Sequence, residues 1–142
     1  MKIAISQILK TCSELPGYGN QRAQYLAQND TLALRVVLQY ALDPRVEFIL
    51  PIGTPPYKPT EHLDQEGNLY RDFRKLSNFI KGGGYPDMHP IRRETLFVQF
   101  IEGLFPQDAE LICSVKDKKI PYKGITAKLV NQAFPGLVKE KE

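Results

Sequence analysis

Apolar residues recur every three or four positions in segment after segment of the chain, which is the spacing of one face of an α-helix. This pattern predicts helices over residues 2–15, 21–28, 31–42, 69–80, 92–104, 106–115 and 124–134. No stretch shows the period of two that marks a half-buried strand. The sequence therefore predicts an all-α fold, a compact bundle of about seven helices.

Pro and Gly residues separate the predicted helices from one another. Together the helices are expected to form one domain, residues 1–138, followed by a charged tail at 139–142. Four prolines between positions 51 and 59 make regular structure improbable there, so residues 51–68 are expected to form a loop pinned to the surface. A proline-rich ligand of the SH3 type is the alternative interpretation of this loop. The amphipathic segment 69–80 places Leu69, Phe73, Leu76 and Ile80 on its apolar stripe.

Overall composition excludes several classes of protein. The 142 residues are 42% hydrophobic, enough for a core, and no stretch approaches the length of a membrane span. Cys12 and Cys113 both lie in apolar helical patterns without a second ligand at metal spacing, which argues against zinc and against a disulfide framework. We expect a soluble protein of the cytoplasm, or of the host cytoplasm if it is encoded by a phage, that does not bind membranes.

Residues suited to catalysis are sparse. His62 and His89 fall in predicted loops, where a solvated histidine is the usual interpretation. The glycines at 82–84 follow no strand and precede no Lys-Ser or Lys-Thr pair, so they predict a helix stop with a hinge rather than a phosphate-binding loop. The acidic residues are scattered and suggest no general acid and base. We expect no enzyme, no cofactor and no metal.

Basic charge is concentrated between positions 116 and 128. Five lysines against one aspartate give this segment a net charge of +4, which exceeds the +3 of the whole chain. The lysines are Lys116, Lys118, Lys119, Lys123 and Lys128. Gly124 is expected to open a helix whose free N–H groups attract an anion, and Thr126 can add a hydroxyl donor. The segment therefore predicts a phosphate-binding site.

A second basic cluster lies on the helices predicted over 69–80 and 92–104. Its members are Arg71, Arg74, Lys75, Lys81, Arg92 and Arg93. They form a second track for phosphates if the two helices lie side by side. For both clusters the alternative is an ordinary solvated helix face.

Both ends of the chain carry helical patterns that occur together in one known family. Residues 8–15 precede a glycine-containing turn, a helix over 21–28 and a short apolar helix over 34–41. Residues 123–137 begin Lys-Gly-Ile-Thr-Ala-Lys and end Phe-Pro-Gly-Leu. On these residues the chain resembles the amino-terminal DNA-binding domain of ATP-dependent DNA ligases, most closely that of T-even phages. It also resembles small proteins of tailed phages that carry a similar Pro-Tyr-Lys-Gly-Ile-Thr segment.

The resemblance implies a helical domain that grips the backbone of double-stranded DNA without reading its sequence. Gly124, Thr126 and Lys128 would bind phosphate, and Lys119 takes the place of a basic residue in the family's preceding turn. Pro121-Tyr122 interrupts the family's pattern, and no Lys-x-Asp-Gly motif follows, so ligation is not implied.

Three functions follow from the sequence. The first is a stand-alone, sequence-nonspecific duplex-DNA-binding protein, an accessory to phage replication, repair or packaging. The second is a module that binds a polymerase, a sliding clamp or a virion protein through exposed aromatic residues such as Tyr57, Tyr85 or Phe105. The third is an enzyme subunit that another chain completes, with the charged face of this chain as a platform for the substrate.

Overall fold

The computed structural model describes residues 3–51, 53–58 and 69–139, and it confirms the all-α fold. Over these residues the only β pairing is an isolated antiparallel bridge between Phe48 and Ile80. The helices are α1 (Ile5–Glu14), α2 (Gln21–Gln28), α3 (Leu32–Leu42), α4 (Leu69–Asp72), the 3₁₀-helix η1 (Phe73–Phe79), α5 (Pro90–Glu102), α6 (Pro106–Lys116) and α7 (Ala127–Ala133).

The first three helices follow the predicted periodicity closely. Thr31 caps α3, because its hydroxyl accepts a hydrogen bond from the Leu34 N–H at 3.1 Å. The helical spacing places Leu32 on the apolar face of this helix together with Leu34, Val37, Leu38 and Ala41. Leu32 instead lies in the first turn of α3 with 56% of its surface exposed. The expected face is otherwise buried.

The segment predicted as one helix over 69–80 winds more tightly than expected. After one turn of α-helix at Leu69–Asp72 it continues as a 3₁₀-helix, in which side chains three residues apart share a face. Phe73, Leu76 and Phe79 therefore form the buried stripe. Ile80, which the α-helical pattern placed on that stripe, is only half-buried.

Proline marks the starts of α5 and α6, as its fixed φ and missing N–H favour. The structure confirms the predicted start of α6 at Pro106, whereas α5 begins at Pro90, two residues before the predicted position. His89 is the N-cap of α5, and its Nδ1 accepts a hydrogen bond from the Ile91 N–H at 3.2 Å. The only other histidine, His62, lies outside the described residues.

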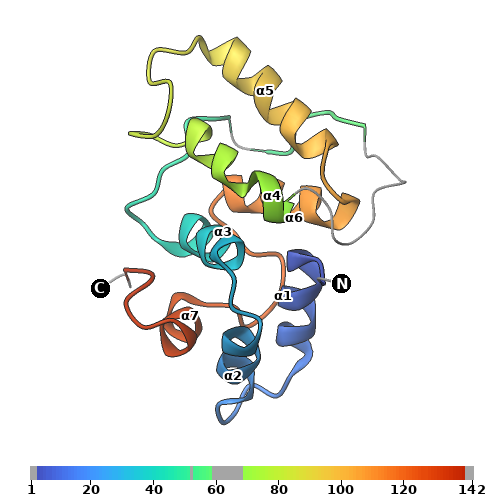
Figure 1. The fold of residues 1–142 in the computed structure, drawn as a ribbon, viewed down its shortest axis with the longest axis vertical. Helices are drawn as coiled ribbons and strands as arrows, with labels where there is room; N and C mark the ends of the chain where they lie inside the picture. The colour runs from blue at the N-terminus through green and yellow to red at the C-terminus, as the bar shows by residue number, and fades with distance from the viewer. Residues whose placement is uncertain (1–2, 52, 59–68, 140–142) are drawn as a thin grey trace.

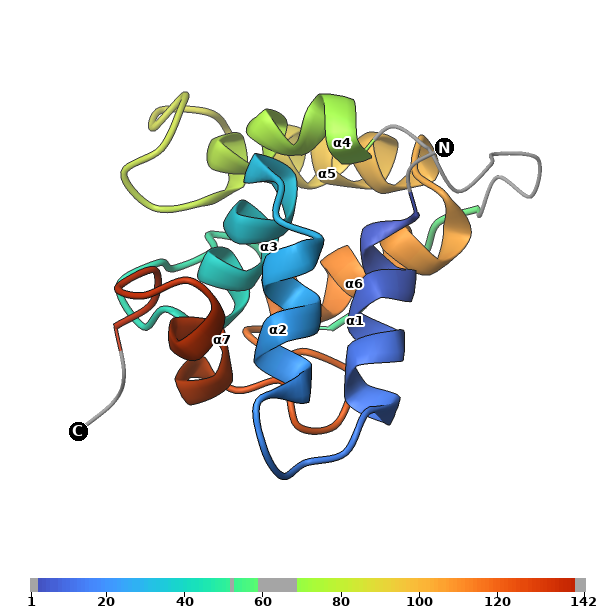
Figure 2. The same ribbon diagram turned by 60° about the horizontal axis from the view of Figure 1, so that its bottom comes forward.

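The helices stack in tiers around a shared core (Figures 1 and 2). At one end α5 packs on η1, the middle is formed by α3 and α6, and α1 and α2 lead to the opposite end, where α7 packs on α2. The largest fully buried side chains include Leu34, Leu76, Phe97, Leu111 and Ile112, which come from α3, η1, α5 and α6. These helices bury one continuous core that positions the loops between them.

The proline-rich loop is attached to the surface of the helices at both of its described ends. Gly53 is held by α6 and the turn after it, and the Lys58 N–H donates to Glu102 Oε2 at 2.9 Å. Tyr57 packs against the core. For residues 51 and 53–58 the structure thus agrees with a pinned loop and not with a free proline-rich ligand.

Within the described residues no helix is both long and apolar enough to cross a membrane.

Candidate nucleic-acid interface

The Lys-Asp turn that ends α6 binds the protein's own backbone. Lys116 is buried, and its ammonium donates hydrogen bonds to the carbonyl oxygens of Pro51 (2.7 Å) and Gly53 (2.8 Å) and to Asp117 Oδ1 (2.7 Å). Asp117 accepts in turn from the Gly53 N–H, at 3.1 Å through Oδ2. An ammonium has three N–H groups, and all three are used here. Lys116 therefore stabilises the fold, and we remove it from the candidate interface.

Lys118 closes the end of α3. Its backbone adopts φ +62°, and its ammonium donates to the carbonyl oxygens of Tyr40 (2.6 Å) and Asp43 (2.8 Å). The last carbonyls of a helix lack partners within the helix and lie at the negative end of its dipole. Lys118 thus caps the carboxyl end of α3, and we remove it from the candidate interface as well.

The helix expected to open at Gly124 begins three residues later, at Ala127. Thr126 is its N-cap, and the Thr126 hydroxyl accepts a hydrogen bond from the Leu129 N–H at 3.2 Å. Gly124 lies in the preceding turn instead, with φ +80°. A helix N-terminus at Gly124 therefore cannot supply the expected phosphate site, although the exposed Thr126 can still donate its hydroxyl hydrogen.

Arg22, which the sequence analysis did not single out, caps the end of α1. Its Nε donates to the carbonyl oxygen of Leu15 at 3.0 Å, and its Nη2 donates to that of Ser13 at 3.1 Å. The end of α1 is in this way tied to the first turn of α2, which carries the arginine.

The same guanidinium brings two glycine turns together, at residues 16–20 and 121–126. A Cβ added at Gly124 would come within 2.1 Å of Arg22 Nη1, and one added at Gly17 would lie 3.5 Å from the same atom. Gly124 needs the absence of a side chain both for its positive φ and for this close approach. The two turns therefore meet at one guanidinium. Figure 2 shows both turns at the α2–α7 end of the molecule.

The two stretches that carry these turns contain basic residues and no acidic ones. Residues 15–29 and 118–139 together contain six basic residues and no Asp or Glu, and we call them the acid-free face. Because the whole chain carries only +3, the remainder is net negative. The two stretches are far apart in sequence, but α2 and α7 pack against each other. Folding thus brings two stretches with net positive charge together.

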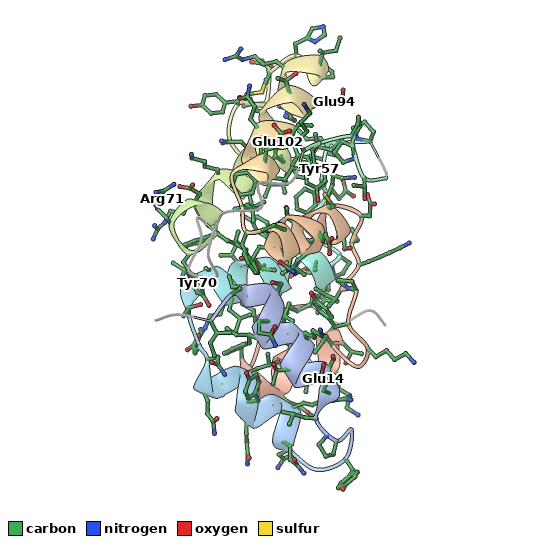
Figure 3. All side chains as sticks on the ribbon, turned by 90° about the vertical axis from the view of Figure 1, so that its right-hand side faces the viewer. Glu14, Tyr57, Tyr70, Arg71, Glu94 and Glu102 are labelled. Carbon is green, nitrogen blue, oxygen red and sulfur yellow. The ribbon has the colours of Figure 1, made fainter. Side chains whose placement is uncertain are left out.

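Three lysines of the acid-free face extend into solvent: Lys119, Lys123 and Lys128 are exposed and form no ion pair within the described residues. The carboxylates at its borders are Glu14, at the end of α1 (Figure 3), and Asp30, which binds Arg35 through both oxygens at 2.6 Å. A hollow of about 380 Å³ between α2 and α7 is lined by side chains without charge. They are Asn20, Ala23, Gln24, Ala27 and Gln132.

The second predicted cluster is partly neutralised by its own aspartate. Arg71, on α4 (Figure 3), donates to both oxygens of Asp72 at 3.1 Å, and Lys75 Nζ lies 3.9 Å from Asp72 Oδ1. The Arg74 guanidinium lies over the Phe73 ring, 4.9 Å from its centroid. Local partners therefore already reduce the positive potential of this surface.

Arg93 is buried, and it donates to the carbonyl oxygens of Asn78 (3.2 Å) and Tyr85 (2.6 Å), so it supports the loop between η1 and α5. Arg92 next to it is exposed. The two helices do pack against each other, as the sequence analysis required, but they run in opposite directions (Figure 1). Arg71 and Arg92 consequently lie at opposite ends of the pair and do not form one track.

Two buried carboxylates stabilise helix ends in opposite electrostatic settings. Hydrogen bonds from the Arg45 side chain are the main cause that lowers the pKa of Asp43 to about 2. Asp108 accepts a hydrogen bond from the Ser6 N–H, at the start of α1, at 2.9 Å. Burial raises the pKa of Asp108, and the contacts with Ser6 oppose that shift. Both carboxylates hold backbone groups rather than face a site.

Both cysteines are free and buried. Burial is the main cause that raises the pKa of both thiols, that of Cys113 to about 11. A thiol in this state is a weak nucleophile at neutral pH. Within the described residues no group of three or more His, Cys, Asp or Glu side chains is placed to hold a metal ion.

The residues that the sequence analysis overlooked had a signal in the sequence. Arg22 is a single charge among amides, and Tyr18 is a single aromatic residue in a glycine turn, so neither stands out by density. What marks them is the long run without Asp or Glu over 15–29 and its counterpart over 118–139. The density of lysines alone does not define this surface, because Lys116 and Lys118 bind the protein's own backbone.

Comparison with known proteins identifies a family without a known activity. Residues 9–122 match the profile of a family of unknown function (DUF6433), and the match includes both Tyr18 and Arg22. No curated protein and no solved structure matches the chain. Since the matched residues make up most of the chain, the protein belongs to this family of unknown function.

Proposed function

We propose that this protein binds double-stranded DNA through its phosphate backbone, without sequence preference, and that the acid-free face is the binding surface. The observation that carries the proposal is the segregation of charge: basic residues from two distant stretches meet at one end of a chain whose remainder is net negative. A surface of this kind attracts a polyanion at long range and presents no carboxylate that would repel it.

The available side chains are of the types that contact phosphates. Lys119, Lys123 and Lys128 supply exposed cations, while Thr126 and the amides along α2 supply neutral donors. Contacts to phosphates carry no sequence information, so binding of this kind is indifferent to the bases. The resemblance to ligase DNA-binding domains agrees with this proposal and extends it to an accessory role in phage replication, repair or packaging. We propose no catalytic step for the chain.

Fluorescence anisotropy with a labelled mixed-sequence duplex tests the proposal. We expect micromolar or tighter affinity at low salt, with a steep fall as salt increases and the same values for an unrelated sequence of about 20 base pairs. The double variant Lys123→Ala/Lys128→Ala removes two phosphate contacts. Its log–log salt slope should fall in magnitude by about two units, because each contact contributes about 0.9.

The matched control is Arg71→Ala/Lys75→Ala, which removes the same charge from the surface that Asp72 already neutralises. It should change the slope much less. Two results would contradict the acid-free face as the binding surface. One is a Lys123/Lys128 variant with the affinity of wild type at every salt concentration, and the other is a control variant that loses as much affinity as the Lys123/Lys128 variant.

A protein-binding role is the second candidate, and a different surface favours it. A groove of about 620 Å³ lies between the proline-rich loop and α5, with Leu50, Phe97 and Val98 among its lining residues. Ile91 at its edge is 67% exposed. Of the aromatic residues expected to anchor a partner, Tyr85 is exposed, whereas Tyr57 and Phe105 are half-buried. Protection of this loop from proteolysis by a candidate protein partner, and not by DNA, would favour this role.

A further inference from the structure

Tyr18 has a solvent-exposed aromatic side chain. Of the large hydrophobic residues in the described part of the chain it is the most exposed, at 75%. It lies between Gly17 and Gly19 in the turn that joins α1 to α2, and Gly19 has φ +72°. A single exposed tyrosine is common on protein surfaces, so its exposure alone indicates nothing. Its surroundings are what distinguish it.

Arg22 lies beside the turn that carries Tyr18. Arg22 binds the carbonyl oxygens at the end of α1, directly before the turn, and the guanidinium lies beside Gly17. The same guanidinium contacts Gly124 on the other turn. Tyr18 follows Gly17, and Lys123 precedes Gly124, so a bare aromatic ring and an exposed lysine occupy two turns that meet at one arginine. Neither turn contains an acidic residue.

A second exposed tyrosine provides the comparison. Tyr85 is 65% exposed and also follows glycine, but it lies in the loop between η1 and α5, at the far end of the molecule (Figure 1). Asp87 is two residues away, and both lie around the same hollow. Arg92 also lines that hollow. The two tyrosines have similar exposure, but an aspartate lies two residues from Tyr85, whereas the run 15–29 around Tyr18 contains no acidic residue.

We propose that Tyr18 is a stacking platform for an unpaired base, and that the preferred ligand is duplex DNA interrupted by a short single-stranded gap. This inference rests on the proposed function, since the lysines hold the backbone beside the tyrosine. In a continuous duplex every base is stacked on its neighbours and cannot reach the ring. In a gap an unstacked base can lie on an aromatic face while Lys123 contacts the adjacent phosphate, and such stacking is indifferent to base identity.

The test compares a continuous duplex with the same duplex carrying a gap of about three nucleotides, one of them 2-aminopurine. Wild-type protein should bind the gapped DNA about tenfold more tightly, the factor expected for one stacked base. It should also quench the 2-aminopurine fluorescence. Tyr18→Phe should keep both effects, because it retains the ring.

Tyr18→Ala should abolish the preference and the quenching while its affinity for the continuous duplex stays within about twofold of wild type, because the lysines remain. Tyr85→Ala is the matched control and should behave as wild type. The thermal unfolding midpoint of each variant, measured by circular dichroism, shows that the fold is kept.

Three outcomes would overturn the inference. Equal wild-type affinity for gapped and continuous DNA, with a steep salt dependence that requires Lys123, would reject the stacking platform and leave the proposed function standing. A Tyr18→Ala variant that keeps the preference and the quenching would place the unpaired base elsewhere. Failure of wild-type protein to bind either DNA at low salt would reject the proposed function and this inference together.

Discussion

Five lysines of one short segment fall into two groups. Lys116 and Lys118 bind the protein's own backbone through their ammonium groups, whereas, within the described residues, Lys119, Lys123 and Lys128 do not. The first two are bound by backbone carbonyls of the segment 40–53, and the other three extend into solvent. The difference arises because the turn after α6 packs against the end of α3 and the proline-rich loop, whereas the chain beyond it runs along the surface toward α7. Charge density along a sequence thus does not separate lysines that build a fold from lysines that face a ligand.

The largest expected effect is that of Lys116→Ala. The substitution leaves the carbonyl oxygens of Pro51 and Gly53 and the carboxylate of Asp117 without their buried donor, and breaking a buried charge pair on one side costs about 3 kcal/mol of unfolding free energy. Urea unfolding followed by circular dichroism measures it. A loss below about 1 kcal/mol would mean that Lys116 is not the anchor of the loop.

The next effect depends on pH and concerns Asp43, whose carbonyl accepts from Lys118. The pKa of the Asp43 carboxyl group is about 2, below the ordinary value of 3.8. The carboxylate therefore stabilises the fold above pH 3.8, and this effect is lost as the pH falls through 2. Asp43→Asn should cost about 1–2 kcal/mol of unfolding free energy at pH 7, allowing for the exposed Arg45 partner, and progressively less in acid. Unfolding by urea across this pH range is the measurement.

Asp108→Asn is the control with the opposite sign. Because burial raises the pKa of Asp108, its contribution to stability is greatest below its ordinary pKa and is lost as the pH rises through the folded value. The amide can still accept from the Ser6 N–H. This variant should be at least as stable as wild type at pH 7, and a pH profile parallel to that of Asp43→Asn would contradict both assignments.

The smallest expected effect on stability is that of the exposed lysines. Lys119→Ala, Lys123→Ala and Lys128→Ala should each change the free energy of unfolding by less than about 0.5 kcal/mol, since their ammonium groups form no ion pair within the described residues. Denaturant midpoints compared with that of Lys116→Ala check the contrast directly. A loss near that of Lys116→Ala in any of the three would erase the distinction between the two groups.

Local sequence signals predicted most of the fold and only part of the site. Periodicity located every helix, and Pro106 marked the start of α6, because these signals lie within a few residues of the element they define. The start of α7 was misplaced because Gly124 was taken as a helix start, whereas Thr126 is the capping residue. Lys116 could not be classified in this way, since the two backbone carbonyls that it binds lie more than 60 positions earlier in the chain.

The contact between Arg22 and Gly124 has a consequence for the way this sequence can change over generations. As long as the Arg22 guanidinium keeps its position, a side chain at position 124 collides with it, so a replacement of the glycine requires the guanidinium to move or the arginine to be shortened. Even then the positive φ at 124 favours residues such as asparagine. The two positions, about a hundred apart in the chain, are therefore expected to change together in relatives of this chain that contain both.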